Sequence, residues 1–137
     1  ANFGKYIRKI DIFEIDDFAC KAIHRYNQAF GHHNIRIFNQ DYFTYKEKRR
    51  THMIINTSCE HMWDMNENKE YYEDPDRTLL VLQSNNKTDE PDHVNCVNSC
   101  QELVTKNELS EVFGDWKRMN EGTPDKYIRF MVMGKWK

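Results

Sequence analysis

The chain has 137 residues, of which 39% are hydrophobic and 31% are charged, and its formal net charge at pH 7 is -2. This length suits one domain with a core of its own, so we predict a single domain over residues 1–137. A charge this close to zero gives no reason to expect nucleic acid as a partner, and no apolar run approaches the roughly 18 residues of a membrane span. We therefore expect no nucleic-acid binding and no membrane insertion.

The first half of the chain predicts one helix among three strands. Residues 6–15 are rich in β-branched and aromatic side chains, which is typical of a strand. Residues 16–31 predict a helix, with Asp16 as the N-cap and Gly31 just past the last turn. Residues 34–46 and 51–63 predict two further strands, and the second of these alternates apolar and polar residues most regularly.

The second half predicts two more strands around a helical segment. Residues 77–83 are almost all apolar, as in a central strand. Two capping-box spacings predict a short helical segment near 99–114, which Gly114 ends, and residues 125–137 predict a closing strand. The order of elements indicates an α+β fold in which a mostly antiparallel sheet packs against one main N-terminal helix.

Four cysteines, an even number, permit two disulfides or a metal site: Cys20, Cys59, Cys96 and Cys100. A structural zinc site wants two close pairs of ligands, which Cys59-x-His61 with Cys96-x3-Cys100 or His93-x2-Cys96 can supply. The C-x2-C spacing typical of zinc knuckles is absent. We therefore predict a disulfide-stabilised fold without a metal, in which Cys96 and Cys100 each bond to Cys20 or Cys59. A zinc-stabilised intracellular domain stays as an alternative.

Two glycosylation sequons accompany the cysteines, Asn56-Thr57-Ser58 and Asn86-Lys87-Thr88. Asn86 lies in a polar stretch typical of an exposed loop. Asn56 falls on the strand face opposite Cys59. Together with disulfides, the sequons predict a secreted, extracellular glycoprotein that is modified at Asn56 and Asn86.

The sequence shows no motif for catalysis or for a cofactor. G-x-S-x-G, H-E-x-x-H and glycine-rich phosphate loops are all absent. The acidic runs are typical of solvated surface, although paired carboxylates of a small hydrolase remain an alternative. We predict no catalytic residue, no cofactor and no enzyme activity.

Aromatic residues near expected loops and a basic turn are of the types that anchor protein interfaces. They indicate a module that binds a protein partner through exposed aromatics and charges. The residues assigned to this surface are Arg49, Arg50, Trp63, Tyr71, Tyr72 and Trp136.

The segment AIHRYN, which ends a helix after a first strand, resembles the cystatin family in outline over residues 4–63. The resemblance implies inhibition of cysteine proteases through an N-terminal glycine, a Q-x-V-x-G hairpin and a late Pro-Trp pair. Gly4 and Trp136 are present, but the hairpin position reads YKEKRR, and Trp136 follows Lys135 and not a proline. A cystatin-like inhibitor is thus the second function that the sequence suggests.

Overall fold

The computed structural model describes residues 6–137, which form two compact units divided between Lys46 and Glu47. We describe each unit by itself. The prediction of a single domain over residues 1–137 is not tested by this division and stays a prediction. Gly4, named for the cystatin resemblance, lies outside the described residues.

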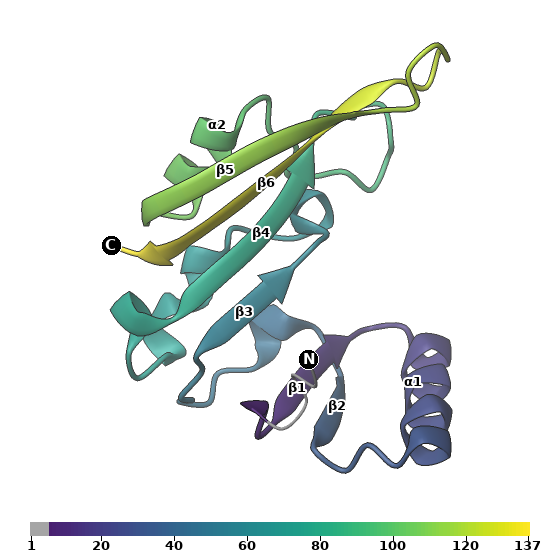
Figure 1. Ribbon diagram of the computed structural model, residues 1–137, viewed down its shortest axis with the longest axis vertical. Helices are drawn as coiled ribbons and strands as arrows, with labels where there is room; N and C mark the ends of the chain where they lie inside the picture. The colour runs from purple at the N-terminus through teal and green to yellow at the C-terminus, as the bar shows by residue number, and fades with distance from the viewer. Residues whose placement is uncertain (1–5) are drawn as a thin grey trace. The chain divides into compact units, whose positions relative to one another are not determined.

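The first unit is a parallel strand–helix–strand element, with β1 (Ile10–Glu14), α1 (Asp17–Phe30) and β2 (Ile35–Asn39) (Figure 1). Asp16 caps α1 through its carboxylate, which accepts hydrogen bonds from the backbone N–H groups of Phe18 and Ala19. Gly31 ends the helix with a φ of 67°. A parallel pair needs a connection of this length, and α1 supplies it.

Aromatic rings hold the two strands of the first unit together. The rings of Phe13 and Phe38 stack with centroids 4.8 Å apart, and Tyr42 and Tyr45 pack against Phe13. Helix α1 leaves three large apolar side chains exposed, those of Phe18, Tyr26 and Phe30.

The second unit contains a mixed four-stranded sheet in the order β3-β4-β6-β5. Strand β3 (Met53–Asn56) is parallel to β4 (Leu79–Asn85), whereas β6 (Tyr127–Trp136) is antiparallel to both β4 and β5 (Leu109–Met119). Helix α2 (Cys100–Lys106) packs against β5 and β6. Short 3₁₀ turns cover Cys59–His61, Met65–Tyr71 and Pro75–Arg77.

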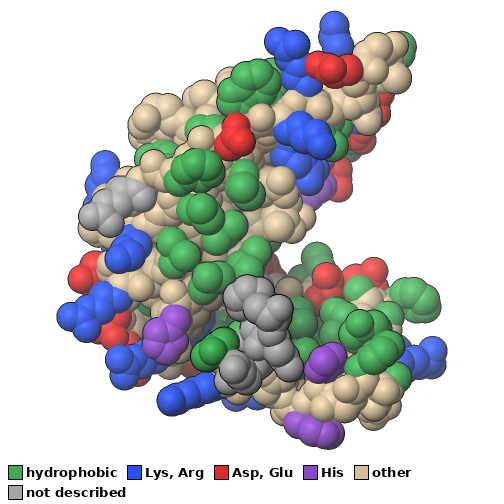
Figure 2. Space-filling view, in the orientation of Figure 1, with side chains coloured by type: hydrophobic (Ala, Val, Ile, Leu, Met, Phe, Trp, Pro, Cys, Tyr) green, Lys and Arg blue, Asp and Glu red, His purple; other side chains and the backbone are tan. Residues whose placement is uncertain are grey.

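The two faces of this sheet differ. The face toward α2 is buried, with Leu80, Leu82 and Val132 closed off from solvent. On the other face four apolar residues lie in register across the sheet, and the two at its sides are exposed. These residues are Ile55, Val81, Met133 and Phe113, and Figure 2 shows hydrophobic side chains gathered over these strands.

The expected α+β arrangement is wrong in two respects. The sheets include two parallel strand pairs, because periodicity identifies a strand but not its direction. The helical segment expected near 99–114 ends at Lys106, and strand β5 runs through Gly114. Glu108 turns the chain with a φ of 52°, and pairing with β6 then overrides the local helix signals.

All four cysteines are free, so the predicted disulfides are wrong. The Sγ atom of each points to a backbone carbonyl oxygen within its own unit, at 3.2 to 3.7 Å. These residues are Cys20, Cys59, Cys96 and Cys100. The sheet and helices therefore close without covalent cross-links.

The sequons give no support to the predicted glycoprotein. The side chain of Asn56 is buried, and its amide group lies 3.4 Å from the sulfur of Met65. The side-chain oxygen of Asn86 accepts a hydrogen bond from the backbone N–H of Ile128 at 2.7 Å. Both side chains thus serve local structure and are not displayed for a sugar.

Candidate functional site

The carboxyl ends of parallel strands are where open α/β sheets bind ligands. In the first unit, Glu14 is the last residue of β1 and stands opposite Asn39, the last residue of β2. The Glu14 carboxylate accepts a hydrogen bond from the backbone N–H of Asp16 at 2.9 Å, and Asp41 accepts one from Phe43 at 2.8 Å. Two oriented carboxylates at this edge can accept hydrogen bonds from hydroxyl or amine groups.

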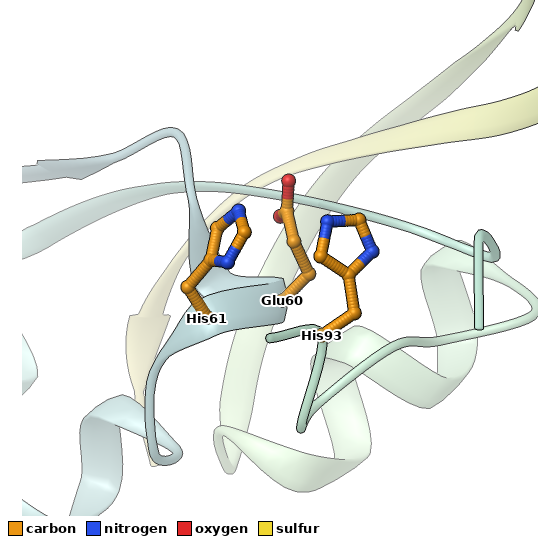
Figure 3. A group of neighbouring side chains, drawn as sticks. All are labelled: Glu60, His61 and His93. Carbon is orange, nitrogen blue, oxygen red and sulfur yellow. The ribbon is translucent and has the colours of Figure 1, made fainter. Parts of the chain in front are cut away.

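In the second unit, the carboxyl ends of the parallel strands β3 and β4 lead to a carboxylate and two imidazoles. Strand β3 ends at Asn56 and leads into the 3₁₀ turn that contains Glu60 and His61. His93 comes from the loop that follows β4. One ligand atom from each of the three residues lies within 4.8 Å of the others, and Figure 3 shows the Glu60 carboxylate between the two rings.

Asn95 fastens the two segments that supply these residues. Its backbone N–H donates to the carbonyl oxygen of Glu60 at 2.9 Å, and its side-chain amide donates to Asp64 at 2.8 Å. Lys106 of α2 donates to the side-chain oxygen of Asn95 at 2.8 Å. Because Asn95 binds both the turn and α2, the loop that carries His93 is held against the turn that carries Glu60.

Cys96 lies beside this cluster, with its sulfur 3.7 Å from Nδ1 of His93. Burial raises the pKa of the Cys96 thiol, and the sulfur donates to the carbonyl oxygen of Lys87 at 3.2 Å. Its sulfur is not among the ligand atoms of this cluster that lie within 4.8 Å of one another. The chemistry of the cluster therefore belongs to the carboxylate and the imidazoles.

Five of the six residues assigned to a binding surface lie around one isolated β-bridge in the second unit, which joins Arg49 and Tyr72. Arg49 pairs with Tyr72, the Arg49 guanidinium lies 4.4 Å from the Tyr72 ring centroid, and that ring packs against Trp136 at 5.1 Å. The Tyr71 carbonyl accepts a hydrogen bond from the backbone N–H of Arg49, and Arg50 pairs with Asp74 at 3.6 Å.

The expected exposure of these aromatics is found in part. Trp63 stands apart from the bridge and is 69% exposed. Tyr72 and Trp136 are only 4% and 1% exposed, so they belong to the core of the second unit. A binding role for the six residues is not tested by these placements.

Sequence reasoning missed Glu14 because it treated the acidic runs as solvated surface, and it missed Glu60 because it placed this residue on the polar face of a strand over residues 51–63. Glu14 had a usable signal, since it ends an apolar strand two residues before a helix cap. Glu60 had a weaker one, a carboxylate directly before a histidine. The proximity of Glu60 to His93 depends on the path of a polar loop that carries no periodicity.

No protein-family model matches this sequence, and no curated protein matches it. Solved structures do match. Trm5b from Pyrococcus abyssi is 12% identical with a TM-score of 0.58, and the match covers 95% of this chain and 38% of that one. N-methyltransferase NodS from Bradyrhizobium japonicum is 13% identical with a TM-score of 0.63, covering 94% and 74%. An rRNA methylase from Streptococcus thermophilus is 13% identical with a TM-score of 0.52, also covering 94% and 74%.

The chain has a Rossmann-like methyltransferase fold. Its sheet is mixed and its helices are few. At 12 to 13% identity the likeness to these structures establishes the fold, and the chain spans only 38% of Trm5b and half of another similar structure. The activity of such a protein is therefore a proposal for this chain.

The methyltransferase fold overturns the functional predictions. A Rossmann-like fold with four free cysteines contradicts the secreted, extracellular, non-catalytic binding module and the cystatin-like inhibitor. The prediction that the chain is not an enzyme is contradicted by the likeness of its fold to solved methyltransferases. The cysteine-based zinc domain also fails, because the cluster that could hold a metal within residues 6–137 contains no cysteine.

The predictions about partners are tested only in part. Among the helices of the described residues, none has both the length and the apolar character that a membrane span requires. The absence of nucleic-acid binding and the presence of a protein partner stay predictions.

Proposed function

We propose that this chain acts in methyl transfer from S-adenosylmethionine. Two observations support the proposal: the likeness of the fold to solved methyltransferases, and the position of Glu14 at the carboxyl end of a parallel strand. Glu14 carries the assignment, because open α/β sheets bind ligands at the carboxyl ends of their strands, and a carboxylate there can accept hydrogen bonds from the ribose hydroxyls of a nucleoside.

The residues of the first unit fit the nucleoside part of this cofactor. Glu14 is half-buried, and the backbone N–H of Asp16 holds its carboxylate at the end of β1. A carboxylate can accept hydrogen bonds from both hydroxyls of a ribose, and Asp41, two residues past the end of β2, can accept one from a base amine. The sequence has five glycines and no G-x-G-x-x-G segment, so the proposal assigns this chain the nucleoside contacts alone.

When bound, S-adenosylmethionine supplies an electrophilic methyl group attached to a positively charged sulfur. The residues of the chain then act by orientation. Glu14 would fix the ribose and thereby the direction in which the reactive part of the cofactor points. A fixed orientation of the reacting groups lowers the activation barrier of a transfer reaction. Phe13 and Phe38, stacked one residue before the ends of both strands, keep the backbone of this edge rigid.

Binding of S-adenosylhomocysteine, the reaction product, tests the proposal by isothermal titration calorimetry on the full chain. Glu14→Gln keeps the shape of the side chain and removes the charge, so we expect binding to weaken by about 10- to 100-fold, as for a charge-assisted hydrogen bond. Glu67→Gln, an exposed position in the 3₁₀ turn Met65–Tyr71, serves as the matched control and should bind like the wild type. Equal affinity of the Glu14→Gln variant and the wild type would remove Glu14 from the site.

A further inference from the structure

We propose that Glu60, His61 and His93 form a binding site for a divalent metal ion of the zinc class. The site lies within the second unit and is independent of the proposed nucleoside contacts of Glu14. Two imidazoles and one carboxylate are the ligand set of catalytic zinc sites that keep one position open, and of the two-histidine, one-carboxylate iron sites. Figure 3 shows one nitrogen of each ring turned toward the carboxylate.

The two histidines are oriented as metal ligands are. A metal-binding histidine usually donates its other ring N–H to a backbone carbonyl or a carboxylate. Nδ1 of His93 lies 2.6 Å from the carbonyl oxygen of Lys87. Nδ1 of His61 lies 3.2 Å from the carboxylate and 3.3 Å from the carbonyl oxygen of Asp92. These contacts favour the tautomer that leaves Nε2 of each ring as an electron-pair donor.

Glu60 supplies an independent sign that a cation belongs here. Its side chain is only 4% exposed, and its Oε1 lies 3.7 Å from a guanidinium nitrogen of Arg129. Its Oε2 is buried and has no hydrogen-bond partner among the described residues. Leaving a buried carboxylate oxygen unpaired costs free energy, and a metal ion bound by this carboxylate and the two imidazoles would remove that cost.

The spacing suits a small ion. Ligand atoms around a tetrahedral zinc ion lie about 3.3 Å apart, given zinc–ligand bonds of about 2.0 to 2.1 Å. The present atoms fall within 4.8 Å of one another, so modest rotations of the side chains bring them to bonding distance. The His61 side chain is 38% exposed, which leaves the fourth position open to water or to an oxygen or nitrogen atom of a substrate.

Titration of the full chain with Zn²⁺ by calorimetry, and with Co²⁺ by visible absorption, tests the site under reducing conditions. We expect one ion per chain and the intense absorption of a four- or five-coordinate Co²⁺ ion. His61→Asn and His93→Asn should each weaken binding by at least about 100-fold, more than loss of an outer-shell partner does. Asn can keep the hydrogen bond that Nδ1 makes, so the loop of His93 should stay in place, which circular dichroism verifies.

Two controls make the outcome decisive. His52→Asn alters an exposed histidine of the same unit outside the cluster and should bind the ion like the wild type. Cys96→Ser should also retain binding, because the thiol is assigned no bond to the metal. Loss of binding in Cys96→Ser, unchanged binding in both cluster variants, or failure of the wild type to bind Zn²⁺ would each overturn the proposal.

Discussion

The imidazole rings of His61 and His93 meet edge to face, with their centroids 4.6 Å apart and their planes at 83°. His61 follows the parallel strand β3, and His93 follows β4, its parallel neighbour. Neighbouring parallel strands end at the same edge of a sheet, so the pairing order brings these two histidines together. The buried carboxylate of Glu60 then converts a pair of rings into a cluster with three electron-pair donors.

Of Trp136 and Trp63, Trp136 should contribute far more to the stability of the second unit. It is 1% exposed and packs against Tyr72, whereas Trp63 is 69% exposed. We expect Trp136→Ala to lower the free energy of unfolding by about 3–5 kcal/mol. Trp63→Ala should change it by no more than about 0.5 kcal/mol. Urea unfolding followed by the remaining tryptophan fluorescence measures both, and similar losses in the two variants would contradict the assigned core.

Gly134 in β6 should tolerate no side chain. A Cβ atom there would lie 2.9 Å from the carbonyl oxygen of Ser110 and 3.1 Å from a methyl carbon of Val112. Relief requires movement of β5 near its bulge, so Gly134→Ala should cost about 1–3 kcal/mol of unfolding free energy. Lys135→Ala, the next residue of the same strand, should cost far less. Equal urea midpoints for the two variants would show that β5 and β6 are not packed as described.

The thiols should be reduced and unequal in reactivity. Burial raises the pKa of Cys59 to about 12, so the thiolate is scarce at pH 8 and alkylation of Cys59 should be the slowest of the four. Alkylation in denaturant without reductant should add four adducts, as read by intact mass. Four adducts would agree with four free cysteines, and two adducts or none would show that the chain contains disulfides.

Arg36 should control the ionisation of Asp11. The guanidinium donates two hydrogen bonds of 2.8 Å to the carboxylate and holds the pKa of Asp11 below its ordinary value of 3.8. A lowered pKa stabilises the folded state above pH 3.8, and this stabilisation is lost as the pH falls through the lowered value. Carbon-detected NMR titration should show a rise in the Asp11 pKa in Arg36→Met. The rise should be smaller in Lys9→Met, whose ammonium lies 3.2 Å away.

The elements of the fold were more accessible to prediction than its topology. The helix capped by Asp16 and ended by Gly31 has clear local signals, and α1 occupies nearly the predicted range. The direction of the strands has no local signal. The predicted helix between two strands was nonetheless long enough for a parallel crossover, so a parallel pairing of these strands could have been predicted. The predicted disulfides failed because an even count of cysteines says nothing about the direction of their side chains.

The candidate sites were largely beyond sequence reasoning for a related reason. His61 and His93 were both considered as metal ligands, but in combination with cysteines. Glu60 was placed with the polar face of a long strand, whereas the chain leaves the strand after Asn56 and turns Glu60 inward. A 3₁₀ turn of three residues is set by tertiary contacts, such as the hydrogen bond from Asn95 to the Glu60 carbonyl, which a local pattern does not encode.

Methyl-donor binding at the end of β1 is tested most directly by the amide spectrum of the ¹⁵N-labelled full chain with and without S-adenosylmethionine. We expect the largest shifts at residues 14–16 and 39–41, with little change on the exposed face of α1. Amide shifts that do not change at millimolar S-adenosylmethionine would contradict the proposed role in methyl transfer. Shifts that change elsewhere but not at residues 14–16 and 39–41 would contradict it as well.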